Sequence, residues 1–383
     1  MVSLRAEREQ ETALLRRDRW RLGIVIGVVL LAIAGLLVLA GGKPVPPGRS
    51  AYDAGTADPV AAAVPVLAGY AEQARGLRFR RPPVVRVAAA ATVTRAAAES
   101  TPVDSGGRAL TDRALGLAGR PPTTPPAAAY SYRRHTVYLR QGQQVDPATR
   151  VALVHALTLA LQDQNTDLAG LRRQAADDQD RTRALAALVE GDATRIELAY
   201  LGSLPAGDQT AVGAKHDHSP SPASYGQLAA AFPATVGRDF AAALAQQGGN
   251  PAVDVAFRRP PTSTAQVIDP QAYQDGIEPL GVRAPAGEGQ RVDAGTLGEF
   301  GLAALITGGR RATNAGAAGR WLGDSYGTFR TGQGLCTYVN IVLAASESRE
   351  QLIRDLGRFV ASHRGRAAVI RSADRGVRLR SCD

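Results

Sequence analysis

An uncharged apolar run near the N-terminus constrains this chain more than any other feature of the sequence. Residues 22–40 read LGIVIGVVLLAIAGLLVLA, and these 19 residues contain no charged side chain. As a helix, such a run is long enough to cross the hydrocarbon core of a bilayer, which is about 30 Å thick. Six arginines precede the run, whereas only Lys43 and Arg49 follow it closely. By the positive-inside rule we expect residues 1–21 to be a cytoplasmic arm, residues 22–40 a single transmembrane helix and the remaining chain extracytoplasmic.

The competing interpretation of this run is a cleaved signal peptide. Small residues near its end, in Val38-Leu39-Ala40, would suit a signal peptidase. The run is longer than the ~7–15 apolar residues of a usual signal peptide, so we favour an uncleaved anchor. Under either interpretation residues 41–383 are exported.

Export bears directly on the two cysteines, Cys336 and Cys382. Disulfides form and persist in oxidising compartments outside the cytoplasm. We therefore expect these two residues to be joined, which would tie down the C-terminal end of the chain.

The charge of the chain is strongly positive and is carried almost entirely by arginine. The formal net charge is +10, and Lys43 and Lys215 are the only lysines. A basic surface favours anionic partners such as lipid or a cell-wall polymer. No block of five like charges and no nucleic-acid-binding motif accompanies it, so nucleic acid is not an expected partner.

The pattern beyond the apolar run indicates a linker followed by a mostly helical domain and a β-rich tail. Residues 41–58 are rich in Gly and Pro and are typical of a tether. Capping residues and apolar spacing predict helices at 59–75, 109–118, 147–164, 181–201, 235–247, 250–258 and 296–306, strands at 83–88 and 135–139, and a polar loop at 203–223. In the tail, residues 321–383, two hairpins flank a helix at 347–362 in the order β-β-α-β-β.

One predicted helix carries a motif with chemical meaning. Residues 154–164 read VHALTLALQDQ, and they resemble the H-E-L-T-H-A-L-Q-D-Q helix of a bacterial family of exported gluzincin-like proteins with a zincin fold. Four later segments are similar to the same family in the same order. They are 187–193 (its E-G-D-A), 260–267 (its P-P-T-S-T-x-Q-[IV]), 296–300 (its L-G-E-[FL]) and 318–326 (its G-W-x-G-D-x-Y). The resemblance implies an α+β chain with a zincin-like helical domain at 59–320 and a small antiparallel sheet at 321–383.

The resemblance also implies where a zinc site would lie. In H-E-x-x-H the two histidines share one helix face and bind zinc, and the glutamate activates the zinc-bound water. The first ligand position here is His155, but the base position is Ala156 and the second ligand position is Leu159. Glu190 matches the third ligand. We therefore expect His155 and Glu190 to be a vestigial pair, with no zinc cofactor and no catalytic residue.

Three further polar residues match positions that surround the metal in active relatives. They are Gln162, Asp163 and Asp192. Since the zinc is expected to be lost, we expect these side chains to brace the two helices together as scaffold.

These expectations favour a membrane-anchored pseudo-metallopeptidase that binds or regulates an envelope protein or peptide without cutting it. The enzyme alternative is a metallopeptidase with a rearranged site, drawing ligands from His216 and His218 in the polar loop. A third alternative is a structural protein whose basic surface lies against anionic wall polymer or lipid.

Overall fold

The computed structural model describes residues 59–100, 106–117, 124–216, 224–311, 313, 315–362, 369–373 and 376–383. The predicted arm at 1–21, anchor at 22–40 and linker at 41–58 lie outside the described residues. Within the described ranges, no helix combines the length and apolarity that crossing a bilayer requires. Residues 63–383 form one compact unit, which holds all of the elements described below except the first turn of the first helix.

A small three-stranded sheet comes first in this unit. Its strands are β1 (Val84–Ala88), β2 (Ala128–Ser131) and β3 (Thr136–Arg140), in the order β1-β3-β2. The pairing is parallel between β1 and β3 and antiparallel between β2 and β3. Helix α3 (Ala90–Ala98) packs on β2 and β3. The strands predicted at 83–88 and 135–139 are confirmed, whereas neither β2 nor α3 was predicted.

Long helices form the bulk of the unit, and two of them begin at the residues predicted from the sequence. Helix α2 (Pro59–Arg75) matches its predicted bounds. Helix α5 (Pro147–Asn165) starts with Pro147 at its first position and with the Asp146 carboxylate accepting from the Thr149 amide. Both features favour initiation, because the cap satisfies a free N–H and proline has no N–H to satisfy.

Helix α7 (Gln179–Ser203) lies between α5 and α9 (Tyr225–Arg258). The crossing of α7 and α9 is close because Gly191 and Gly237 meet there, and a Cβ on either would overlap the backbone of the other helix. Helix α9 breaks at Gly248 and Gly249, which have non-helical angles. The predicted helices at 235–247 and 250–258 are therefore both present, and the first begins earlier, at Tyr225.

The predicted polar loop at 203–223 is wrong for much of its length. Residues Ala206–His216 form helix α8, which packs against α5. Val212 is the buried anchor of this helix, at 2% exposure. The helix sequence AGDQTAVGAKH has few apolar residues, so its periodic signal is too weak for the helix to be predicted from sequence.

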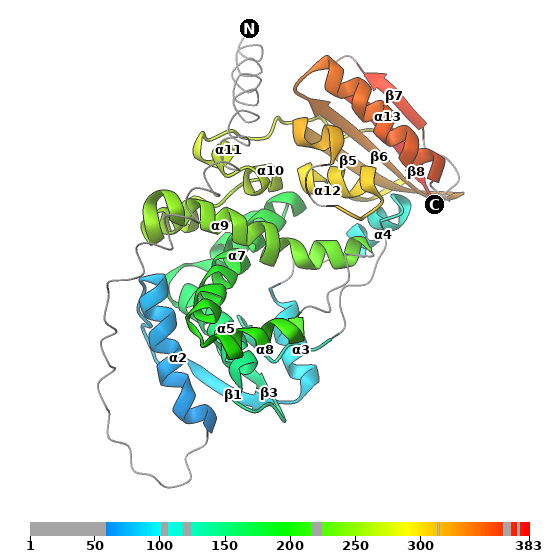
Figure 1. Cartoon of the computed structure of the whole chain (residues 1–383). Helices are drawn as coiled ribbons and strands as arrows, with labels where there is room; N and C mark the ends of the chain where they lie inside the picture. The colour runs from blue at the N-terminus through cyan, green and yellow to red at the C-terminus, as the bar shows by residue number, and fades with distance from the viewer. Residues whose placement is uncertain are drawn as a thin grey trace. The chain divides into compact units, whose positions relative to one another are not determined.

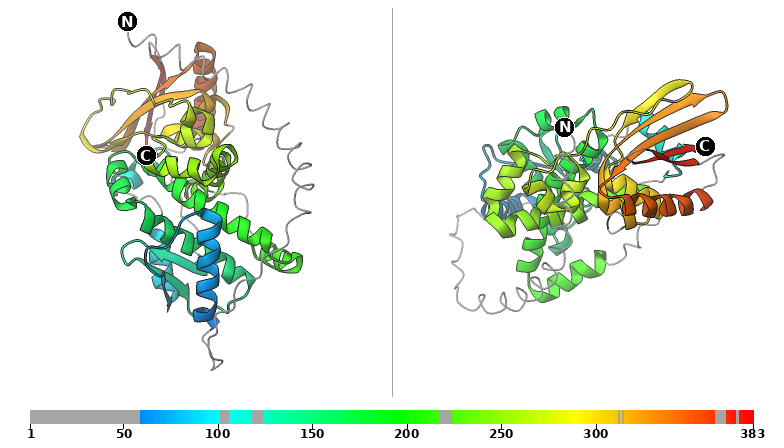
Figure 2. Two further views of the ribbon diagram at one scale, coloured as in Figure 1. Left: turned by 90° about the vertical axis from the view of Figure 1, so that its left-hand side faces the viewer. Right: turned by 90° about the horizontal axis from the view of Figure 1, so that it is seen from above.

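The C-terminal part is a five-stranded antiparallel sheet. Its strands are β4 (Gln290–Gly295), β5 (Trp321–Thr331), β6 (Gly334–Leu343), β7 (Val369–Ala373) and β8 (Gly376–Cys382), in the order β4-β5-β6-β8-β7. Helix α13 (Ser346–Ser362) covers one face, and the segment before β4 crosses the opposite face (Figures 1 and 2). Both predicted hairpins are confirmed. Strand β4 was not predicted, and it brings a segment from before residue 321 into the sheet.

Short elements complete the connections. They are α4 (Gly106–Ala114), α6 (Leu168–Ala175), α10 (Thr264–Ile268), α11 (Pro270–Gln274), α12 (Gly298–Thr307) and a 3-10 turn at Gly316–Arg320. The fold class is thus α+β, mostly helical with a C-terminal antiparallel sheet, as expected. The predicted disulfide is also confirmed: Cys336 on β6 and Cys382 on β8 lie opposite each other in register and are bonded.

Candidate functional site

The centre of the candidate site is His155, which lies on α5 with α7 packed against it. Its Nε2 atom is 3.1 Å from Oε2 of Glu190, the residue that the motif pairs with it. Its Nδ1 atom is 2.9 Å from Oε2 of Glu197, which lies two turns further along α7. The imidazole is therefore held between two carboxylates, with 22% of its side chain exposed.

The two carboxylates determine the charge of the imidazole. Burial acts to lower the pKa of His155, but the bonds to Glu190 and Glu197 outweigh it and raise the pKa to about 10. Burial likewise acts to raise the pKa of Glu190, but the bond from His155 and the charges of His155 and Arg172 lower it. At neutral pH the site is a cationic imidazolium between anionic carboxylates.

An aromatic and a cationic side chain flank the far side of Glu190. The guanidinium carbon of Arg172 lies 3.6 Å from the ring centroid of Tyr132, a short cation–π contact. Burial, followed by the negative charge of Glu190, raises the pKa of the Tyr132 hydroxyl. Tyr132 therefore stays neutral beside Glu190, and Arg172 adds a second positive charge to the site.

The two positions at which the sequence departs from the H-E-x-x-H pattern lie inside the core. Ala156 has no exposed surface and Leu159 is 3% exposed. Neither side chain has an atom that could bind a metal or take a proton. The apolar substitutions thus fill a closed part of the α5 surface beside His155.

The donor geometry around His155 does not favour a single metal ion. Its two ring nitrogens point away from each other, so Glu190 and Glu197 lie at opposite edges of the ring. Metal-binding imidazoles are neutral and offer one free nitrogen to the ion. Among the described residues, no group of three or more His, Cys, Asp or Glu side chains has a metal-binding arrangement.

Gln162 and Asp192 lie in a buried polar network next to this site. The Gln162 amide donates to Asp192 Oδ2 at 3.0 Å and to the Val189 carbonyl at 3.2 Å, which joins α5 to α7. Asp192 also accepts from Arg75 on α2, at 2.5 Å, and from Arg195, at 2.8 Å. The carboxylate of Asp192 thus connects three helices while it is fully buried.

Asp163 does not join the two helices, so that part of the expected scaffold is wrong. Its Oδ2 atom accepts from the Tyr130 hydroxyl at 2.6 Å and lies 2.8 Å from Nδ1 of His135. These partners belong to β2 and to the turn before β3. Asp163 reaches them, and its neighbour Gln162 reaches α7, because successive residues of α5 point in different directions around the helix. Asp163 therefore fixes α5 to the small sheet.

The remaining motif segments meet in a second buried network around the start of α12. The Thr264 hydroxyl and amide donate to Asp180 of α7 at 2.6 and 3.0 Å. Asp324 of β5 accepts from the amides of Leu297 and Gly298 at 2.8 and 2.9 Å and from the Trp321 indole at 2.8 Å. The segments around 260–267, 296–300 and 318–326 are therefore held together by buried carboxylates, as scaffold for the helices.

No motif predicts Glu197, which contacts His155, or His135, which contacts Asp163. The structure does not describe the side chains of the alternative metal ligands, His216 and His218. Glu197 is separated from Glu190 by seven residues, so the two share one face of α7, which is the signal that points to it. His135 is far away in sequence and carries no pattern. His218 lies outside the described residues, and the structure does not describe the side chain of His216.

Comparison of the chain with family models, with curated proteins and with solved structures found no match to any of them.

Proposed function

We propose that this chain is a membrane-anchored extracytoplasmic pseudo-metallopeptidase, a zincin-like protein that binds or regulates an envelope protein or peptide without hydrolysing it. The observation that carries the proposal is the environment of His155. Both of its nitrogens are engaged by Glu190 and Glu197, and buried apolar side chains stand at positions 156 and 159.

The charge balance of the metal-free site supports the proposal. The bonds to Glu190 and Glu197 raise the pKa of His155 to about 10, so at neutral pH its imidazolium supplies the positive charge between the two carboxylates. A salt-bridged triad is thus a self-sufficient substitute for a metal site.

The absence of a base at position 156 supports the loss of catalysis. General-base assistance contributes ~10²–10⁴-fold to hydrolytic rates. Ala156 is fully buried on α5, so a base from a neighbouring element would have to displace core packing to act there. The proposal therefore assigns the protein a binding role.

The decisive experiment is metal analysis of the full-length chain, purified in neutral detergent without chelator. We expect zinc far below one ion per chain, and no hydrolysis of a mixed peptide library. A stoichiometric zinc that resists dialysis would overturn the proposal in favour of a rearranged metallopeptidase.

A restored variant tests the zincin-like relationship itself. Ala156→Glu with Leu159→His rebuilds the H-E-x-x-H pattern, and adding Glu197→Gln frees one nitrogen of His155. We expect the triple variant to bind zinc, whereas Ala156→Glu alone, which supplies no ligand, does not. A folded triple variant, verified by circular dichroism, that binds no zinc would count against the relationship.

The membrane topology has a separate test. In intact cells, a tag at the C-terminus should be cleaved by added protease, and a tag at the N-terminus should be protected. The reverse pattern would overturn the proposed extracytoplasmic location and leave the proposal about His155 untouched.

A further inference from the structure

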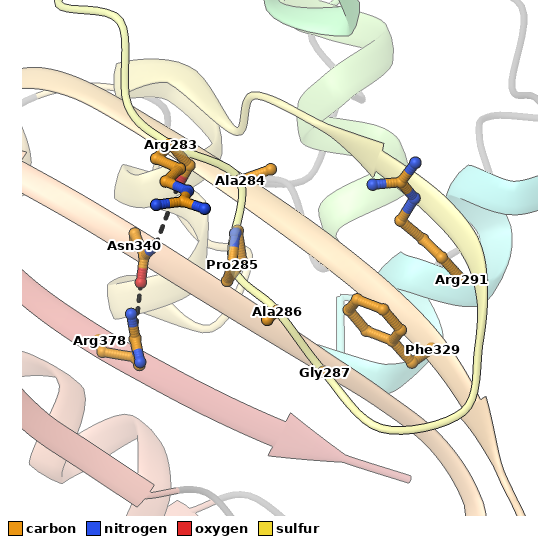
Figure 3. Close-up of a pocket in the computed structure, with 9 residues that line it drawn as sticks. All are labelled: Arg283, Ala284, Pro285, Ala286, Gly287, Arg291, Phe329, Asn340 and Arg378. Atoms are coloured by element: carbon orange, nitrogen blue, oxygen red, sulfur yellow. Dashed lines mark hydrogen bonds between the residues drawn. The ribbon is translucent and has the colours of Figure 1, made fainter.

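A second candidate site, remote in the fold from His155, lies on the five-stranded sheet. A cavity of about 710 Å³ opens on the sheet face opposite α13, between strands β5, β6 and β8 and the segment that leads into β4. Figure 3 shows the residues that line it, with arginines entering from three elements. Its volume is within the ~300–1,000 Å³ of ordinary ligand sites.

The segment that roofs the cavity is fixed to the sheet. The Leu280 amide donates to the Leu322 carbonyl at 2.8 Å, and the Asn340 amide donates to the Arg283 carbonyl at 3.0 Å. Further along, Gly287 lies against the ring of Phe329, at a distance that no Cβ would allow. The cavity is therefore a built feature of this face.

Three guanidinium groups line the cavity without a carboxylate partner. They belong to Arg283 in the roof, Arg291 on β4 and Arg378 on β8. Within the described part of the chain, Arg378 alone of the three has a side-chain hydrogen bond, from Nε to Asn340 Oδ1 at 2.8 Å. Among the described residues, none of the three forms an ion pair with Asp or Glu, and no acidic residue lines the cavity. The acids nearest to Arg291 in sequence are Asp293 and Glu288, and neither lines the cavity. Asp293 accepts from Thr111 and Tyr326, and Glu288 is exposed.

Arginines elsewhere in the unit vary in this respect. Arg75 and Arg195 each contact a carboxylate, whereas exposed Arg86 forms no ion pair with a described residue. What sets the three guanidinium groups above apart is that all of them line one cavity. Three unpaired cations around one cavity raise its local potential and attract an anion. The ligand whose charge would complement the cavity is thus an oxyanion with several acceptor atoms.

We propose that this cavity binds a phosphate group carried by a larger molecule. A carboxylate has two oxygens in one plane and is saturated by one or two guanidinium forks, whereas a phosphate can accept from three directions. Arg283 comes from the roof, Arg378 from β8 and Arg291 from β4, and Figure 3 shows Arg291 on the other side of Phe329 from the first two, so the donors face the cavity from different sides. This arrangement fits phosphate better than carboxylate.

The rest of the lining indicates that the phosphate is attached to an apolar or carbohydrate group. Ala284, Pro285 and Ala286 form one wall, and the ring of Phe329 forms another. Phe329 is braced edge-on by Tyr338, with ring centroids 5.8 Å apart. A sugar or glycerol portion would pack on these surfaces while the arginines hold its phosphate. The source could be a phosphorylated glycan or a phospholipid headgroup, which share this chemistry.

Isothermal titration calorimetry of the full-length chain in neutral maltoside detergent tests the proposal. The probes are inorganic phosphate, glucose 6-phosphate and short-chain phosphatidylglycerol, with glucose and glucuronate as phosphate-free controls. We expect the phosphate-bearing probes to bind and the affinity to fall as NaCl is raised. Tighter binding of the sugar phosphate would assign a glycan source, and tighter binding of the lipid would assign a headgroup.

Variants locate the binding. Arg291→Gln removes a side chain with no hydrogen bond in the structure and should weaken binding about tenfold, with near-complete loss in Arg283→Gln/Arg291→Gln/Arg378→Gln. The matched control is Arg330→Gln, which removes the same charge from an exposed residue one position after Phe329 on β5. We expect its affinity to stay within about twofold of the parent chain.

The proposal is overturned if Arg291→Gln and the triple variant bind phosphate as the parent does. It is also overturned if no phosphate-bearing probe binds at about 10 mM, or if glucuronate binds most tightly. Because none of these measurements depends on His155 or on zinc, their outcome is independent of the proposed pseudo-peptidase function.

Discussion

The imidazole of His155 lies 3.1 Å from the carboxylate of Glu190, although 35 positions separate the two residues in the chain. Helices α5 and α7 bring them together, and Glu197 closes the other side of the ring. The residues that resemble part of a zinc site thus form a salt-bridged triad that joins α5 to α7. The first prediction follows from this triad.

Replacing His155 with Gln should destabilise the protein and change how its stability depends on pH. The variant leaves Glu190 and Glu197 without their shared cation, which should lower the free energy of unfolding by about 3 kcal/mol at pH 7. His155 has a folded pKa of about 10 against an ordinary 6.5. Its contribution is therefore complete below pH 6.5 and is lost as the pH rises through 10.

The measurement is urea unfolding of the parent and the variant between pH 6 and 10. Taking the difference between the two free energies of unfolding cancels the effect of groups that titrate in both proteins. This difference should shrink toward high pH. His135→Gln is the control, because His135 is 65% exposed in its contact with Asp163 and should change stability little. A difference that grows with pH would contradict the prediction.

Asp192→Asn should be among the most damaging conservative substitutions in the helical region. It removes the charge that faces Arg75, a guanidinium with 1% of its side chain exposed. An unpaired buried charge costs about 3–5 kcal/mol, and the remaining contact of Arg75 with Asp254 offsets part of that. Thermal unfolding should show a large fall in Tm. Asp239→Asn, which disrupts the exposed pair with Arg238, should shift Tm by little, and equal effects of the two would refute the buried network.

Gly298→Ala tests the junction between α7 and α12. Gly298 has φ +73°, and a Cβ on it would overlap the carboxylate of Asp180. We expect a loss of more than about 3 kcal/mol, because steric overlap adds to backbone strain. Gly276 has a similar φ of +64° with open space around it, so Gly276→Ala should cost only about 1 kcal/mol. Chemical denaturation of both variants separates the two effects, and similar losses would show that the overlap is relieved.

Removing the disulfide should weaken the C-terminal sheet. The bond between Cys336 and Cys382 closes a loop of 46 residues. Chain-entropy arguments assign such a loop about 4 kcal/mol of stabilisation. Cys336→Ser/Cys382→Ser should therefore unfold at lower urea concentration than the parent, and reductant should shift the parent but not the variant. Identical midpoints for the parent with and without reductant would contradict the assignment.

Local chemistry accounts for the parts of the fold that were predicted. Asp146 and Pro147 mark the start of α5 because capping and proline act within one turn, and the two C-terminal hairpins follow from alternating strands around short turns. The disulfide was predicted because the sequence contains one pair of cysteines and the chain was expected to be exported. Strand β4 and helix α8 were missed, since each depends on a distant partner, β5 for the one and α5 for the other.

The sequence by itself determined which chemical groups are present and which are missing. His155 and Glu190 could be paired through a motif, and Ala156 and Leu159 could be seen to lack the atoms that hydrolysis requires. Only the tertiary structure decided the charge of His155, because that depends on Glu197 reaching its second nitrogen across the α5–α7 contact. It also decided that Arg283, Arg291 and Arg378 face one cavity. The sequence specifies each side chain directly. The burial of a side chain and its charged neighbours are set only when segments far apart in the chain pack together.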